Sequence, residues 1–148
     1  RQQIFERDGV LVIDDSYNAS PDSMRAALSI LREMKDRRRI AVLGDMKELG
    51  AEEKELHREI GAALAAAEGA DCVFTLGELA GELAEAFRAH CKAPYSPELG
   101  CFSEREELFG ALKEKVKPGD AILFKASNSM KFSELADYFS GQGERGAH

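Results

Sequence analysis

Four short runs of almost uninterrupted apolar residues recur along this chain of 148 residues, and amphipathic, helix-like segments lie between them. Runs of this kind are typical of strands buried on both faces of a parallel sheet. The predicted strands are residues 10–13, 39–43, 71–76 and 121–124, with a further short strand near residues 101–102. Apolar residues at helical spacing predict helices over residues 21–35, 52–67 and 78–90, after Ser103, and across the segment carrying Met130, Leu135 and Phe139. The alternation predicts an α/β fold: a Rossmann-like three-layer sandwich with a mostly parallel sheet.

Turn and cap residues refine this outline. Asp8-Gly9 joins two strand-like pieces, residues 2–6 and 10–13, and predicts an N-terminal antiparallel hairpin at one edge of the sheet. Ser20 is expected to cap the first helix, with Pro21 in its first turn. Gly69 is expected to end the second helix, whose predicted inward face is Leu56, Ile60, Ala63 and Leu64. Ser103 is expected to cap the helix that follows it.

Composition limits the classes of function. The net charge is −7, and the acidic residues are spread along the helices, which argues against a nucleic-acid groove. The basic run at residues 35–39 is expected to be a solvated helix end. The three cysteines lack metal-ligand spacing; Cys72 is expected to pack as a small hydrophobe, and a reducing cytoplasm is the simplest setting.

The chain length suits one domain, predicted over residues 1–140 and followed by a disordered tail, residues 141–148. The abrupt, strand-like start suggests a domain excised from a longer protein. No apolar run approaches the ~20 residues of a membrane span, and no signal peptide is visible. The sequence contains neither a G-x-G-x-x-G dinucleotide fingerprint nor a Walker-type lysine loop, so the chain is not expected to cradle a triphosphate by itself.

The oddest polar segments follow the predicted strands, at the sheet edge where ligands bind in folds of this class. In "DDSYNASPDSM", residues 14–24, an aspartate can accept hydrogen bonds from ribose hydroxyls, and Tyr17 or Asn18 can contact an adenine. The alternative is structural: Ser20 and Asp22 cap the helix, and Asp14 braces a turn.

Two further segments share that edge. In "GDMKELG", Asp45 and Lys47 follow Gly44, and the lysine either holds a carboxylate or is simply solvated. In "KASNSM", Lys125, two hydroxyls and the Asn128 amide precede a helix; they form an anion-binding nest or merely cap that helix. His57, on the second helix, is read as a packing or surface residue with catalysis as the alternative.

Three segments, in this order, resemble the Mur ligase family: "DDSYNASPDSM", "AVLGDMKELG" with "HREIG" after it, and "VKPGDAILFKASNSMKF". The resemblance runs from Arg1 to about Phe139 and is to the family's C-terminal domain, in the branch that adds D-Ala-D-Ala. It implies an ATP-dependent acid–amino-acid ligase of three domains, acting in peptidoglycan precursor synthesis in the bacterial cytoplasm. A carboxylate of UDP-MurNAc-tripeptide becomes an acyl phosphate, which the D-Ala-D-Ala amine attacks. ATP and Mg²⁺ would be held mainly by the central domain, so this piece alone should be inactive.

The resemblance also implies roles for individual residues. It places Arg1, Asp15, Tyr17 and Asn18 at the nucleotide. It places Lys47, Ser127, Asn128 and Ser129 at the incoming amine. Asp45, His57 and Lys125 are additional candidates, and no catalytic residue or metal ligand is assigned. The sequence departs from the family where Asn128 replaces an arginine and Ser133 replaces an acidic residue. The domain is expected to close on its own central and N-terminal domains.

Two other functions remain open at this point. One is another amino-acid-adding Mur ligase or a folate-type relative, with a different amine substrate. The other is a non-catalytic α/β binding module.

Overall fold

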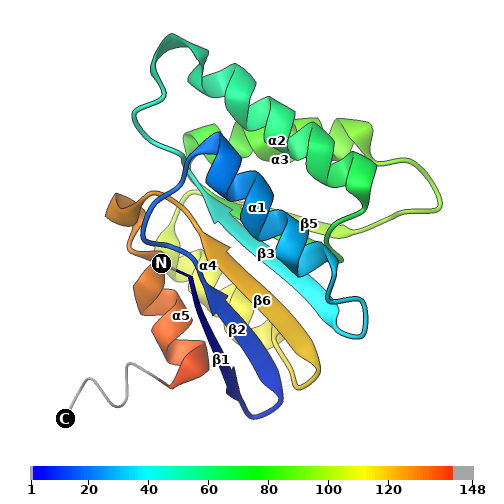
Figure 1. Cartoon of the computed structure of the whole chain (residues 1–148), viewed down its shortest axis with the longest axis vertical. Coiled ribbons are helices and arrows are strands. Elements are labelled where there is room, and N and C mark those ends of the chain that lie inside the picture. The colour runs from blue at the N-terminus through cyan, green and yellow to red at the C-terminus, as the bar shows by residue number, and fades with distance from the viewer. Residues whose placement is uncertain (1, 142–148) are drawn as a thin grey trace.

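The computed structural model of the chain describes residues 2–141, which form six strands and five α-helices (Figure 1). The strands are β1 (Gln3–Arg7), β2 (Val10–Asp14), β3 (Arg38–Gly44), β4 (Cys72–Leu76), β5 (Glu98–Phe102) and β6 (Asp120–Lys125). The helices are α1 (Pro21–Arg32), α2 (Glu53–Ala67), α3 (Glu78–His90), α4 (Arg105–Lys115) and α5 (Phe132–Ser140), with 3₁₀ turns at η1 (Gly50–Glu52) and η2 (Asn128–Met130).

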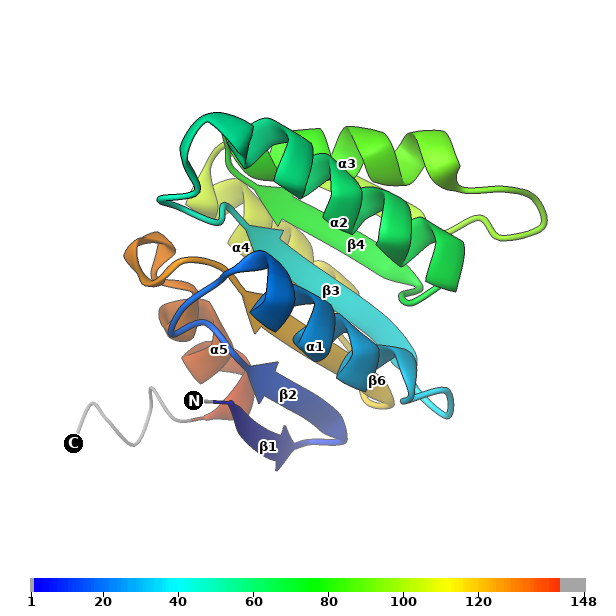
Figure 2. The ribbon, with the colours of Figure 1, turned by 45° about the horizontal axis from the view of Figure 1, so that its top comes forward.

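One sheet joins all six strands in the order β1-β2-β6-β3-β4-β5. Every neighbouring pair is parallel except β1–β2. Helices α1, α2 and α3 cover one face, while α4 and α5 cover the other (Figures 1 and 2). The predicted three-layer α/β fold with an N-terminal hairpin is confirmed.

Local sequence accounts for most of the elements. Asp8 and Gly9 have φ of 54° and 81°, as a two-residue hairpin turn with positive φ at both positions requires. Ser20 caps α1: its Oγ accepts a hydrogen bond from Ser23 N at 3.2 Å, and Pro21 occupies the first turn. Strand β6 is buried along its whole length, in accordance with its central position between β2 and β3.

Several boundaries differ from expectation. Glu68, not Gly69, takes the left-handed conformation after α2, with φ of 49°. Glu104, not Ser103, precedes α4, and no side chain caps that helix. The inward face of α2 is His57, Ile60, Gly61, Leu64 and Ala65, whereas Leu56 is half-buried and Ala63 is exposed.

Strand β5 begins at Glu98, three residues before the short strand predicted near residues 101–102. It lies at the edge of the sheet and none of its residues is fully buried, so it needs no continuous apolar run. Gly100 is suited to its place: a Cβ there would lie 2.8 Å from Cδ1 of Phe74 on the neighbouring strand.

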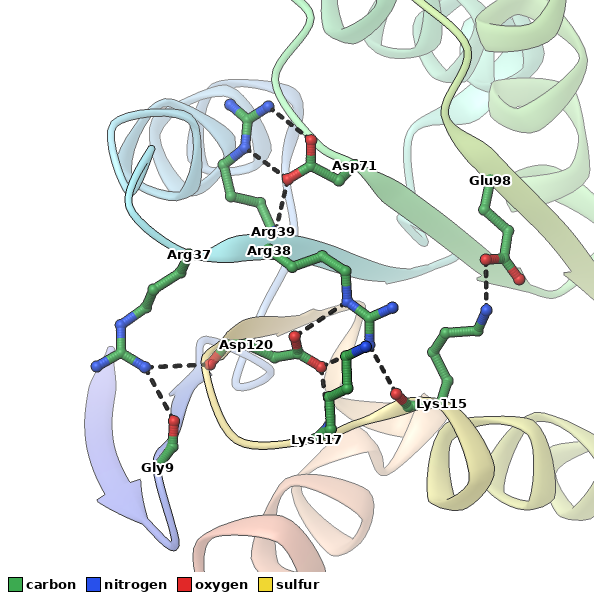
Figure 3. Close-up of polar contacts among 9 residues, drawn as sticks. All are labelled: Gly9, Arg37, Arg38, Arg39, Asp71, Glu98, Lys115, Lys117 and Asp120. Carbon is green, nitrogen blue, oxygen red and sulfur yellow. Dashed lines mark hydrogen bonds and ion pairs between the residues drawn. The ribbon is translucent and has the colours of Figure 1, made fainter.

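The basic run at residues 35–39 is not a solvated helix end, because α1 stops at Arg32 and β3 begins at Arg38. Figure 3 shows that the arginines instead tie strand ends together at the amino edge of the sheet. Arg38 makes a two-pronged contact with Asp120 (3.0 and 2.7 Å), and Arg39 makes one with Asp71 (3.1 and 3.2 Å). Although burial alone would raise it, the pKa of Asp71 is lowered by hydrogen bonds from Arg39. The run is therefore structural.

Cys72 is buried in the core, as predicted. Within residues 2–141, no helix is long and apolar enough to cross a membrane. Helix α5 ends at Ser140, and the predicted disordered tail lies, apart from Gly141, outside the described residues.

Candidate functional site

Three polar loops meet at the carboxyl edge of the sheet, toward which the arrowheads of the parallel strands point (Figures 1 and 2). We name them by one residue each: the Asp15 loop (residues 15–20) after β2, the Asp45 loop (45–52) after β3, and the Ser127 loop (126–131) after β6. Because β6 lies between β2 and β3, the Ser127 loop is the middle one. The predicted gathering of these segments at one edge is confirmed by hydrogen bonds between them.

The Asp15 loop is folded by its own side chains. Asp14 Oδ1 accepts hydrogen bonds from Ser16 N at 3.2 Å and from Ser16 Oγ at 2.5 Å, so Asp14 braces the turn. Asn18 Oδ1 accepts from the next backbone N–H at 2.9 Å. Tyr17 is 55% exposed, and Asn18 is also exposed. The loop therefore presents an aromatic ring and an amide to solvent from a rigid turn.

Lys125 anchors that loop from beneath. Its side chain is buried at the end of β6, and its Nζ lies 3.2 Å from Asp15 Oδ2. The same Nζ donates to Asp15 O at 3.2 Å and to Asn18 O at 2.7 Å. The ammonium therefore faces the protein interior, and the Asp15 carboxylate is partly committed to it.

Asp45 holds three elements together. Its Oδ1 accepts from Ala80 N at 2.7 Å, in the first turn of α3, and its backbone oxygen accepts from Ser127 N at 3.0 Å. Gly77 makes the approach possible, because a Cβ there would lie 2.4 Å from Asp45 Oδ1. Lys47 Nζ is 4.0 Å from Asp45 Oδ2, and the lysine side chain is 47% exposed. The cation of Lys47 thus reaches solvent from a fixed base.

His57 braces the same loop from α2. Its Nε2 accepts a hydrogen bond from Met46 N at 2.9 Å, and its Nδ1 contacts Glu53 O at 2.7 Å. Since Nε2 is an acceptor here, the proton is on Nδ1, which donates to the carbonyl. The ring is neutral and fully buried, with both nitrogens engaged. This geometry accords with the packing interpretation of His57.

The Ser127 loop presents both buried and exposed groups. Ser127 Oγ accepts from Lys47 N at 2.7 Å, which joins this loop to the Asp45 loop. Asn128 and Ser129 lie in η2 and are exposed. The exposed side chains form the outer layer of the rim: Tyr17, Asn18, Lys47, Asn128 and Ser129. An inner layer of bracing groups holds them: Asp15, Asp45, His57, Lys125 and Ser127.

Sequence reasoning missed the contribution of Gly77, which has φ of 115° and admits the Asp45 carboxylate to the start of α3. The available signal was a glycine placed directly after the buried strand β4. Arg1 lies outside the described residues. Within residues 2–141, no group of three or more His, Cys, Asp or Glu side chains is placed to hold a metal ion. Ligand roles for the rim residues stay predictions.

Comparison with known proteins gives one consistent family. The family model described as "Mur ligase, glutamate ligase domain" matches residues 1–128. The chain is 38% identical over 137 residues to the UDP-N-acetylmuramoyl-tripeptide–D-alanyl-D-alanine ligase of Bacillus subtilis, covering 91% of this chain and 29% of that protein. It is 45% identical over 127 residues to the Escherichia coli protein of the same name, covering 84% of this chain and 26% of that protein.

Solved structures agree. The MurF ligase of Thermotoga maritima in complex with ADP is matched with a TM-score of 0.74 and 30% identity, over 97% of this chain and 31% of that one. A MurF structure from Acinetobacter baumannii is matched with a TM-score of 0.77 and 26% identity, over 94% of this chain and 30% of that one. The chain thus spans less than a third of each of these four relatives.

Proposed function

This chain belongs to the Mur ligase family, and from this premise we propose that it is the C-terminal domain of a ligase that adds D-Ala-D-Ala to UDP-MurNAc-tripeptide. The full-length enzyme would use ATP to convert a substrate carboxylate to an acyl phosphate, in the bacterial cytoplasm. The observation that carries the proposal is the identity to ligases of that name, 38% and 45%, over most of the chain. The ADP complex of a structural relative supports the use of ATP.

The rim supports a nucleotide contact at its β2 side. Tyr17 is exposed for stacking, and the Asn18 side chain is exposed beside it. Asp15 Oδ2 faces Lys125, so the proposed acceptor of a ribose hydroxyl is its other oxygen, Oδ1. These groups position a nucleotide without cradling its phosphates, and the phosphate and Mg²⁺ contacts are assigned to the central domain.

The β3 and β6 side of the rim supports a contact with the incoming amine substrate. Lys47 is half-exposed and supplies a cation for the carboxylate of D-Ala-D-Ala. Asn128 and Ser129 add an exposed amide and hydroxyl on the adjoining loop. Because Asn128 brings no charge, Lys47 carries the electrostatic part of this proposed contact. Closure of the domain on its neighbours would orient the amine and exclude water from the acyl phosphate.

The test is phosphate release by the full-length protein, measured with a coupled assay in the presence of ATP and UDP-MurNAc-tripeptide. We expect release that depends on D-Ala-D-Ala and is absent with single amino acids. Release with a single amino acid instead would indicate another amino-acid-adding or folate-type ligase, and no release with any amine would favour a binding module. The isolated domain is expected to hydrolyse no ATP and to bind nucleotide weakly by calorimetry.

A further inference from the structure

Lys125 is the most deeply buried charge at the rim, with 1% of its side chain exposed. A buried ammonium is stable only when its charge is compensated and its donors are used. Lys125 Nζ contacts three oxygens: it donates hydrogen bonds to Asp15 O at 3.2 Å and to Asn18 O at 2.7 Å, and it forms an ion pair with Asp15 Oδ2 at 3.2 Å. The charge is thus compensated within the protein. Because only 1% of the side chain is exposed, we place Lys125 behind the rim and not in contact with a ligand.

The position of Lys125 in the chain gives this contact a second consequence. It is the last residue of β6, and the Ser127 loop begins at the next residue. Ser127 Oγ accepts a hydrogen bond from Lys47 N, and Ser127 N donates one to Asp45 O. Hydrogen bonds from Lys125 to the Asp15 loop and hydrogen bonds between Ser127 and the Asp45 loop thus start from two residues only two positions apart at the end of β6. All three loops are held at one strand end.

We propose that Lys125 is a positioning residue that couples the Asp15 loop to the Ser127 loop, so that the nucleotide side and the amine side of the rim are ordered together. This inference rests on the proposed function for its kinetic consequences, although the coupling itself is a property of the fold. Lys125 acts through Asp15 and Asn18 and touches no substrate.

The decisive variant is Lys125→Met in the full-length protein, because methionine keeps much of the buried stem and removes the ammonium. The Asp15 carboxylate then loses its cation, and two loop carbonyls lose their donor. We expect the KM for ATP to rise about 10-fold, the equivalent of one lost charge-assisted hydrogen bond. The KM for D-Ala-D-Ala is expected to rise as well, although Lys125 contacts neither substrate.

A matched control lies at the opposite edge of the sheet. Arg38 forms a two-pronged ion pair with the buried Asp120, at 3.0 and 2.7 Å (Figure 3). Arg38→Met should lower the stability of the protein but leave both KM values unchanged. Equal rises in KM for the Lys125 and Arg38 variants would show general destabilisation and overturn the proposal.

Amide hydrogen exchange of the full-length protein, without substrates, tests the coupling directly. Lys125→Met should raise exchange in residues 15–20, and Asp15→Asn should raise exchange in residues 126–131, on a loop that Asp15 does not belong to. Faster exchange confined to residues 15–20 in Asp15→Asn would overturn the coupling. The Asp15 variant also decides the question if Lys125→Met fails to fold. If the wild-type protein showed no ligase activity, the proposed function would fail while exchange still tested the coupling.

Discussion

Gly61 lies where α2 packs against the backbone of α3, and replacing it with alanine should destabilise the fold. A Cβ at this position would lie 2.1 Å from Leu83 O and 3.0 Å from both Leu83 C and Phe87 N. These are backbone atoms of a helix, so no flexible side chain can move aside. Since nonbonded carbon contacts are most favourable near 3.5–4.0 Å, the two helices would have to separate by about 1 Å.

Two opposing effects set the magnitude. Glycine to alanine within a helix normally stabilises by about 0.8–1.0 kcal/mol, because alanine has the higher helix propensity. Overpacking of a tight interface costs about 1–3 kcal/mol, and the contact here is more severe than ordinary crowding. We therefore expect Gly61→Ala to lower the free energy of unfolding by about 1–2 kcal/mol, or the Tm by roughly 2–8 °C for a chain of this size.

The chain offers matched controls. Gly81 in α3 and Gly110 in α4 are also helical, and a Cβ at either would meet no atom within 4 Å. Alanine at these two positions should raise stability by up to about 1 kcal/mol through helix propensity alone. Urea unfolding followed by circular dichroism measures all three variants. A Gly61 variant as stable as the Gly110 variant would refute the close helix approach.

Three further predictions concern the rim and the core. In the full-length ligase, His57→Gln keeps an acceptor for Met46 N–H, whereas His57→Asn keeps only the contact with Glu53 O. Steady-state kinetics should show a raised KM for D-Ala-D-Ala in the asparagine variant alone. Equal kinetics of the two variants would argue against the bracing role of His57. Asn128→Arg should change the KM for D-Ala-D-Ala and not that for ATP; no change in either would remove this residue from the amine contact. Burial raises the pKa of Tyr95 to about 12 from 10.0. Because the pKa of Tyr95 is higher in the folded than in the unfolded protein, the stabilising contribution of this residue is complete below pH 10 and is lost as the pH rises through 12. The free energy of unfolding should therefore fall less steeply with increasing pH for Tyr95→Phe than for wild type.

Much of the fold was predictable because the signals are local. Apolar runs predict the buried strands, apolar residues at helical spacing predict the helices, and Asp8-Gly9 predicts the hairpin. Each of these patterns depends only on residues within a few positions of one another. The rim was predictable for a related reason: in a parallel sheet the carboxyl ends of the strands share one edge. Strand β5 was predicted too short because Pro97 and Gly100 mask a short edge strand.

The amino-acid sequence by itself determined the elements, the three layers and the side of the sheet on which the polar loops gather. Only the tertiary structure decided which of those polar groups face inward. Lys125 and the two residues it anchors are 110 and 107 positions apart, and Arg38 and Asp120 are 82 apart. Such pairs depend on the insertion of β6 between β2 and β3, and no local pattern encodes that strand order. From the sequence, Lys125 is therefore predicted to be a ligand-binding group, whereas in the folded protein three oxygens of the Asp15 loop surround its ammonium.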